Sequence, residues 1–450
     1  MKHFFKPINK TSVPALIWIY LVSGLMTFST GVYAHNTDKT DSTGNAYTDS
    51  LAKSYPIQNE YFIEELRKQT YDKNLFRHYV STYKSIFKAL NESIKEGHMV
   101  HMPGMSALLE QILHEIKTKN PAVPGDVSIL LVRDNIPNAY TMGDHTVFVN
   151  MGLFYHLESE DQVAAIIAHE IGHIVLKHSI QALNNSYKRD KESIEEVKTI
   201  RHADIKRSDF ALELLRNSIY RGKEIGREHE MQADSLGYVL LSNTRYNSSS
   251  FVKALEIIEA YDSLSNKDTL HAAIYKRLFD LPGQPFKDKW LKGEDFSSYN
   301  YSAYKPRFDE DSVSTHPKTE ERIKYLADIF PGSVSERAAD APKTDSYDKI
   351  RVQAEKELMP NLFFNEEYGS ALYKSLLSLQ ANHDEEYYKT WMSKCLQKLY
   401  EARRDYKLNK YLDRVTPKDQ TESYMMFLNF MWNLNLTEIK NIADFYPVQE

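Results

Sequence analysis

Two histidines four residues apart, His169 and His173, lie inside an apolar stretch with strong helix signals, and this motif constrains the fold of the chain more than any other feature. Ser159 and Gln162 have the spacing of a capping box, which is typical of a helix N-terminus. Apolar residues then recur at helical spacing through residues 163–175. Because residues four apart lie on one face of a helix, the two imidazoles can bind one metal ion.

Glu170 lies between the two histidines and points to the adjacent side of the same helix. From this position a carboxylate can reach a water beside the metal without being a ligand, take its proton and pass the proton to a leaving amine. Glu170 is therefore the candidate general base. The His-Glu-x-x-His pattern is only moderately specific, so the interpretation depends on a third ligand elsewhere in the chain.

A third metal ligand is predicted on a second helix, at Glu230. A catalytic zinc needs three protein ligands and an open fourth position, and the single cysteine, Cys395, rules out a cysteine-rich site. Glu230 can bind the metal while Asp234, four residues on, accepts a hydrogen bond from the free ring nitrogen of a ligand histidine. His229 and Glu228 are competing ligands. The alternative is a surface helix whose acidic residues are only solvated.

Together these motifs resemble the zinc metallopeptidases of the HtpX and BepA type, a family that also includes the CAAX prenyl endopeptidases. The sequence reads HEIGH at residues 169–173 and EMQAD at residues 230–234. Residues 137–153 are similar to the strand and turn that in this family precede the metal helix and border the substrate cleft. The resemblance covers residues 106–329, and it implies a zincin-like catalytic domain, one Zn²⁺ per chain and hydrolysis of peptide bonds in protein or peptide substrates.

Further downstream, residues 315–317 read Thr-His-Pro and residues 322–323 read Arg-Ile, similar to an element of the same family whose histidine comes close to the zinc. The resemblance implies that His316 either stabilises an oxyanion or occupies the open zinc position in a latent resting state. A histidine before proline is also a common loop residue. Arg322 is a possible site residue or a structural ion-pair partner. His178 lies off the helical phase of the ligands and is interpreted as a structural residue or a neighbour of a ligand.

Changes of composition along the chain predict five segments. Residues 1–34 combine a lysine-containing start, an apolar run and small residues, which predicts a signal peptide cleaved after Ala34, with an uncleaved anchor as the alternative. The other segments are an N-terminal disordered and helical segment, a zinc metallopeptidase domain, a linker and a helical C-terminal domain, at residues 35–100, 101–333, 334–347 and 348–450, respectively.

The predicted fold is α+β and mainly helical, with a small β-sheet beside the metal helix. Residues 127–132 and 146–150 are short apolar runs on either side of a segment rich in Asn, Pro and Gly, so we expect two strands joined by a loop. Residues 35–55 are expected to be disordered, residues 184–227 to form a charged helical excursion and residues 282–313 to form a surface loop. A tetratricopeptide repeat array is not predicted in the C-terminal region.

Charge and hydropathy restrict the partners of the chain. Its net charge is -6, with acidic and basic residues interspersed, so it has no basic stripe of the kind that nucleic acid requires. No apolar run after residue 34 approaches the length of a membrane span, so the mature chain is expected to have no integral span. The C-terminal helices are a possible surface for a protein partner.

These observations predict an exported zinc endopeptidase, in the periplasm and, by resemblance, in envelope protein quality control. One alternative is a chaperone-like or scaffold protein with a latent or structural zinc site, which four protein ligands at the metal would support. Another is a peptidase that acts outside the cell and is made as a zymogen, with residues 35–100 as a removable segment.

Overall fold

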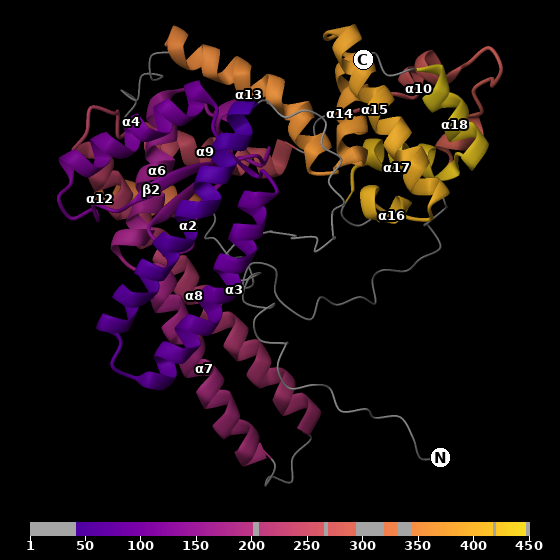
Figure 1. Ribbon diagram of the computed structural model, residues 1–450. Coiled ribbons are helices and arrows are strands. Elements are labelled where there is room, and N and C mark those ends of the chain that lie inside the picture. Colours follow the sequence, from indigo (N-terminus) through magenta and orange to yellow (C-terminus); the bar gives the residue numbers. More distant parts are fainter. Residues whose placement is uncertain are drawn as a thin grey trace, which may run out of the picture. The chain divides into compact units, whose positions relative to one another are not determined.

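The computed structural model describes residues 42–200, 207–264, 269–293, 319–331, 344–416 and 420–446 (Figure 1). The chain forms two compact units, one of Met1–Glu256 with Pro306–Ile350 and the other of Ile257–Lys305 with Arg351–Glu450. The described part is mainly helical and contains one mixed four-stranded sheet, so the predicted α+β class is confirmed. The predicted signal peptide at residues 1–34 lies outside the described residues.

The described part of the first unit begins with two long helices, α2 (Ser42–Gln69) and α3 (Lys73–Lys95). Residues 42–55 are therefore helical, and the prediction that they are disordered is wrong. The reason is burial, because Tyr55 is 1% exposed and packs in a cluster with Tyr83 and Phe87. Its hydroxyl also donates a hydrogen bond of 2.6 Å to Asp144. Packing over long sequence distances stabilises a helix that the polar composition of this segment does not indicate.

The sheet has the strand order β1-β2-β4-β3, formed by β1 (Met99–Val100), β2 (Ser128–Val132), β3 (Ala139–Thr141) and β4 (Thr146–Asn150). β2 and β4 are parallel, with Ile129 opposite Val147, and the two outer strands pair antiparallel with them. The two predicted strands are confirmed as β2 and β4. β3 lies in the segment expected to be a loop, where pairing with the fully buried β4 gives three residues a strand conformation.

The other helices of the first unit are α4 (Pro103–Lys119), α5 (Gly152–His156), α6 (Glu160–Val175), α7 (His178–Ile200), α8 (Arg207–Ser242) and α12 (Thr319–Ile329). α9 (Ser250–Leu264) begins in the first unit and ends in the second. α6 contains the two motif histidines, and Ser159 caps it by accepting a hydrogen bond of 3.3 Å from the Gln162 amide. Since α6 packs against β3, β4 and α8 and is buried along most of its length, the motif lies in the core beside the sheet, as expected.

The charged residues 184–227 are helical where the structure describes them, as the sequence predicts. α6 and α7 meet at a bend of 48°, and Lys177 at this bend has a φ of 57°. α7 and α8 then run side by side away from the sheet (Figure 1). Across the described ranges no single helix has both the length and the apolar character to cross a membrane, although the bent pair Glu160–Val175 and His178–Arg189 meets the criterion by length and composition.

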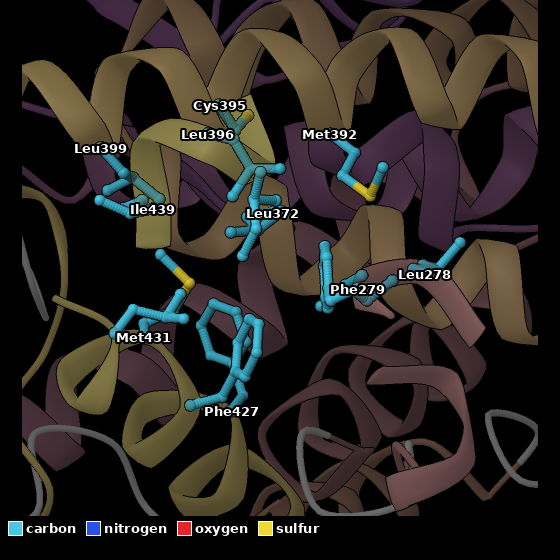
Figure 2. Packing of buried hydrophobic residues seen from close by; sticks show 14 of the residues in the cluster. Leu278, Phe279, Leu372, Met392, Cys395, Leu396, Leu399, Phe427, Met431 and Ile439 are labelled. Carbon is cyan, nitrogen blue, oxygen red and sulfur yellow. The ribbon is translucent and has the colours of Figure 1, made fainter. Parts of the chain in front are cut away.

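The second unit is helical in its described part, and its elements are α10 (Ala272–Phe279), η1 (Asp288–Leu291), α13 (Asp345–Phe364, which begins in the first unit), α14 (Tyr368–Gln380), α15 (Glu385–Arg404), α16 (Leu408–Tyr411), α17 (Glu422–Asn433) and α18 (Leu436–Phe445). Figure 2 shows its core, where Leu372 of α14, Leu396 of α15 and Met431 of α17 meet. Cys395 lies in the same core, and burial raises the pKa of its thiol.

Residues 270–291 contribute to the core formed with the C-terminal helices and belong to the second unit. Trp290 of η1 is fully buried, with its ring centroid 5.4 Å from that of Phe286 and 6.3 Å from that of Phe430. Residues 282–293 are largely an exposed loop, as predicted, except for the short turn η1 and the buried Trp290. Their composition is that of a loop, but one large aromatic side chain fixes them to a core formed much later in the sequence.

Candidate metal centre

Helices α6 and α8 bring the side chains of His169, His173 and Glu230 together. Their nearest ligand atoms all lie within 4.8 Å of one another, and within the ranges that the structure describes this is the group that could hold a metal ion. The Nε2 atoms of the two histidines are 3.1 Å apart. One Glu230 oxygen is 3.5 Å from His169 Nε2, and the other is 3.5 Å from His173 Nε2.

These separations fit a small tetrahedral ion. Ligand atoms that are each about 2.0–2.1 Å from a tetrahedral zinc lie about 3.3 Å apart, and the two Nε2 atoms are 3.1 Å apart. Each Nε2 atom lies 3.5 Å from a different oxygen of Glu230, so both oxygens of this carboxylate face the two imidazoles. Two imidazoles and a carboxylate are also a ligand set that catalytic zinc sites use. The group contains Glu230, and it contains neither His229 nor Glu228, the two competing candidates.

Two glycines allow the ligand-bearing helices to approach closely. A Cβ atom at Gly172 of α6 would lie 2.9 Å from the backbone oxygen of Ala233, and one at Gly237 of α8 would lie 2.9 Å from the backbone nitrogen and Cα of His169. Any larger residue at these positions would press on backbone that cannot rotate away. The ligands on α6 and α8 therefore converge because the two helices touch backbone to backbone.

A buried carboxylate contacts the Nδ1 side of the His169 ring, opposite its ligand atom Nε2. The Nδ1 atom lies 2.9 Å from Asp234 Oδ1. Arg322 of α12 donates two hydrogen bonds to Asp234, from Nε at 2.7 Å and from Nη2 at 2.6 Å, and Nη2 also lies 3.7 Å from Glu230. Arg322, only a possible site residue by sequence, thus links α12 to both acidic residues of α8.

The buried charges around His169 favour a positive charge at this position. Burial raises the pKa of Asp234, but the guanidinium of Arg322 outweighs this effect and holds the pKa below its ordinary value, so that Asp234 stays ionised. Burial lowers the pKa of His169, but Asp234 and Glu230 outweigh it and raise the pKa to about 10. An ion bound at Nε2 would take the place of the proton that these carboxylates hold there.

The Nδ1 side of the His173 ring, opposite its ligand atom Nε2, faces uncharged side chains. The Nδ1 atom of His173 lies 2.9 Å from Nδ1 of His178, whose Nε2 lies 3.1 Å from Oε1 of Gln232. His178 also stacks on His229, with ring centroids 4.1 Å apart and planes inclined by 5°. Burial lowers the pKa of His173 to about 3 and that of His178 to about 4, so both rings are neutral near pH 7.

Glu170 is buried beside the ligand group without belonging to it, and its Oε1 atom lies 3.9 Å from His169 Nε2. This is the position that the sequence predicts for a base next to the metal. His316 lies outside the described residues, so the structure gives no position for it.

His178 is a neighbour of a ligand, one of the two interpretations that the sequence left open, and its partner Gln232 is the residue that sequence reasoning missed. The helical phase of α6 ends at the bend at Lys177, which turns the His178 ring back toward His173. Gln232 had no signal in its spacing, because it is two residues from Glu230 and two from Asp234, and residues two apart on a helix do not share a face. Only the fold shows that it meets a histidine from α7.

Both ligand-bearing helices, strands β2, β3 and β4 and helix α12 fall within one stretch of the chain that matches a known family. The chain belongs to peptidase family M48, whose model matches residues 105–329. The resemblance inferred from the motifs at residues 106–329 is therefore confirmed, and the chain is a member of a metallopeptidase family.

A curated relative from Vibrio cholerae serotype O1, named "Putative beta-barrel assembly-enhancing protease", is similar over a shorter stretch. The two chains are 24% identical over 96 residues, which is 21% of this chain and 20% of the relative. The chain thus matches about a fifth of the length of that relative.

Proposed function

We propose that the chain is a zinc-dependent endopeptidase, with one Zn²⁺ held by His169, His173 and Glu230. The observation that carries the proposal is the convergence of these three ligand atoms beside Glu170 in a peptidase family whose members depend on a metal. A zinc ion bound there supplies Lewis acidity, which polarises the scissile carbonyl and makes a water more acidic. Asp234 keeps the Nδ1 atom of His169 protonated and so orients its Nε2 lone pair.

Glu170 acts as the general base in this proposal. It takes a proton from the attacking water and later gives it to the leaving nitrogen of the cleaved peptide bond. Its place on α6, one residue after His169 and 3.9 Å from that ligand nitrogen, supports the assignment. The carboxylate reaches the same space as the ligands while remaining outside their group.

The edge strand β3 is the proposed binding site for an extended stretch of substrate. Among the described strands, β3 pairs with β4 alone, and it packs against the motif helix α6. A peptide that adds to the outer edge of β3 would run past the ligand group as one more strand. Binding of this kind suits cleavage inside a chain, because it grips the substrate backbone and needs no chain end.

His316 enters the proposal by resemblance, either as a donor to the oxyanion or as a ligand that closes a latent site. The two roles predict opposite results for His316→Ala. Loss of an oxyanion donor lowers the rate of hydrolysis by about 10²–10³. Loss of a blocking ligand raises it.

The proposed setting is the envelope of a bacterial cell, with the periplasm preferred over the extracellular space. The sequence of residues 1–34 supports export. The name of the Vibrio cholerae relative connects a similar sequence with assembly of β-barrel proteins, which makes protein quality control the proposed role. Substrates are then proteins or peptides, and the C-terminal helices are the proposed site for a protein partner.

The test is the metal content of the purified full chain and of Glu170→Gln, with casein hydrolysis measured in parallel. We expect one equivalent of zinc in both proteins and hydrolysis only in the wild type. Zinc without hydrolysis in either protein would favour the chaperone-like alternative with a latent or structural site. A wild type that binds no zinc would overturn the ligand assignment.

A further inference from the structure

Three side chains outside the ligand group form a continuous chain of contacts that ends at the ligand His173. Glu228 accepts a hydrogen bond of 3.0 Å from Nε2 of Gln232, whose Oε1 lies 3.1 Å from Nε2 of His178. The other nitrogen of His178, Nδ1, lies 2.9 Å from Nδ1 of His173. Each of these distances is that of a hydrogen bond, so the position of every proton along the chain can be worked out.

The carboxylate of Glu228 sets the orientation of Gln232. An ionised carboxylate only accepts hydrogen bonds, so the amide group of Gln232 must turn its NH₂ toward Glu228. Its carbonyl oxygen then faces His178, and this oxygen can also only accept. His178 must therefore carry a proton on Nε2.

The proton on His178 determines the proton on His173. A neutral imidazole with a proton on one nitrogen has a lone pair on the other, so Nδ1 of His178 accepts. The facing Nδ1 of His173 must then be the donor, and its Nε2 is left with a lone pair. That Nε2 is the atom that faces His169 and Glu230 in the ligand group.

The reverse arrangement would prevent metal binding. If His178 carried protons on both nitrogens, Nδ1 of His173 would have to accept, and a neutral His173 would carry its proton on Nε2, where the ion belongs. A His178 that donated from Nδ1 and accepted at Nε2 would likewise fail, because the carbonyl oxygen of Gln232 that faces Nε2 has no proton to give.

We infer that His178 and Gln232 are positioning residues that fix the tautomer of His173 and present its Nε2 lone pair to the metal. The inference rests on the proposed zinc site. His169 reaches the same state by a different route, with the charged Asp234 at its Nδ1 atom. The structure thus assigns one charged and one neutral support to the two histidine ligands, both supplied in part by α8.

The neutral support follows from the spacing on α8. Glu228 and Gln232 are four residues apart, as are Glu230 and Asp234, so each pair shares a face of the helix, and the offset of two residues places the two pairs on different faces. One pair contains a ligand and the support of His169, and the other contains the two residues that orient His178. A change at Gln232 should therefore act on the metal through His173 without touching a ligand.

The experiment measures zinc affinity of the metal-free full chain by competition with a chromophoric chelator, in the absence of substrate. His178→Phe keeps a ring and removes both nitrogens, and Gln232→Met keeps the length of the side chain and removes the acceptor. We expect His178→Phe to weaken zinc binding by about ten- to a hundredfold, the usual effect of removing a residue that supports a ligand. Gln232→Met should weaken it by a smaller factor.

His229→Phe is the matched control, because it keeps an aromatic ring stacked on His178 and should leave zinc affinity unchanged. His178→Gln returns an acceptor to the position facing His173 and should restore part of the affinity. The double variant of His178→Phe and Gln232→Met should bind zinc no more weakly than His178→Phe alone, because both residues act through one chain of contacts. The visible spectrum of the Co²⁺-substituted protein should shift in His178→Phe and not in His229→Phe.

Equal zinc affinity in wild type, His178→Phe and Gln232→Met would overturn the inference, as would a double variant whose losses add. Circular dichroism identifies a variant that fails to fold, and Gln232→Met then provides the test without altering a buried ring. A wild type that binds no zinc would instead overturn the proposed function. Normal zinc binding and hydrolysis in the wild type with unaffected variants would overturn only the role of His178 and Gln232.

Discussion

Asp234 has two buried partners, the ring of His169 and the guanidinium of Arg322. The attraction between Asp234 and Arg322 offsets the free energy that each charge loses when it is removed from water. Removing one charge therefore destabilises the protein, because the other stays buried without this compensation. Stability of the folded chain and orientation of the ligand thus depend on the same carboxylate. The two effects can be separated by substitution.

We expect Asp234→Asn to lower the free energy of unfolding by about 3–5 kcal/mol, because the buried Arg322 loses its hydrogen-bonded carboxylate and keeps only the 3.7 Å contact with Glu230. Zinc affinity should fall by about ten- to a hundredfold, because His169 loses the acceptor at Nδ1. Urea unfolding of the metal-free protein measures the former, and chelator competition measures the latter.

The control is the double variant of Asp234→Asn with Arg322→Met, in which no buried charge is unpaired. It should recover much of the stability and none of the zinc affinity. If Asp234→Asn were as stable as the wild type, the ion pair with Arg322 would have no part in holding α12 on α8.

Asp144 gives the folded state a pH dependence that is separate from the metal. Burial raises the pKa of Asp144 above its ordinary value of 3.8, although Tyr55 and the Thr146 amide donate hydrogen bonds to the carboxyl. The folded protein therefore binds this proton more tightly than the unfolded chain does. The stabilisation is complete below the ordinary pKa and is lost as the pH rises through the raised one.

Asp144→Asn should remove the loss of folding stability that the wild type shows as the pH rises, while keeping the size of the side chain. The free energy of unfolding of the variant, measured relative to the wild type by urea at several values from about pH 4 to pH 7, should increase as the pH rises. Other titrating groups contribute equally to both proteins and cancel in the difference. A difference that does not change with pH would contradict the prediction.

At the scale of single residues, the sequence predicted that His169, His173 and Glu230 lie together, because spacing on a helix determines which side chains share a face. Glu230 could be preferred to its neighbours on the same ground. The role of Glu170 as the base stays a prediction. The partners of Arg322 and His178 could not be predicted, since each depends on how α12 or α7 packs on α8. His316 remains a prediction.

At the scale of elements, the contact between α6 and α8 determines whether the ligands meet. Gly172 and Gly237 lie where each helix touches the backbone of the other. Helix propensity and packing predict opposite results for an alanine at these positions. Alanine favours an isolated helix by about 1 kcal/mol over glycine.

We expect Gly172→Ala to lower the free energy of unfolding by about 1–3 kcal/mol, because the new methyl group would press on the backbone of Ala233. Zinc affinity should fall with it, since α6 and α8 must move apart. Gly125→Ala is the control, as a Cβ there meets nothing within 4 Å, and it should change stability by no more than about 0.5 kcal/mol. A gain in stability for Gly172→Ala would show that the helices adjust freely.

Elements with strong periodic patterns were predicted from sequence, and elements held by distant partners were not. β2 and β4 are apolar runs with turn residues beside them, and α6 has both a cap and a helical pattern. β3 is too short to have a pattern, and the start of α2 is polar. Their conformation depends on contacts with β4 and with the cluster around Tyr83.

At the scale of the whole molecule, each unit has a hydrophobic core of its own, and the second one depends on Trp290. This side chain comes from the early part of the unit and packs on rings from the late part. The expected linker at residues 334–347 is only partly described, so the domain boundaries there stay a prediction.

Trp290→Ala should lower the stability of the second unit by about 3–5 kcal/mol through the cavity that it leaves. Zinc affinity should be unchanged, because the ligand group lies in the first unit. Calorimetry with and without zinc distinguishes the units, since zinc stabilises only the unit that binds it. Trp290→Phe should show a smaller loss, and a loss of zinc binding in Trp290→Ala would contradict the separation of the two cores.

The chain passes from the first unit to the second at residue 257, returns at residue 306 and leaves again at residue 351. A ribosome that makes this chain therefore releases α10 and Trp290 long before the C-terminal helices that pack on them. Arg322 emerges after Trp290 and before those helices. The ligand group can form once α8 has emerged, but the support that Arg322 gives to Asp234 arrives only later. Newly made chains thus pass through a stage with the metal ligands assembled, Asp234 without its guanidinium partner and part of a second core exposed to other chains.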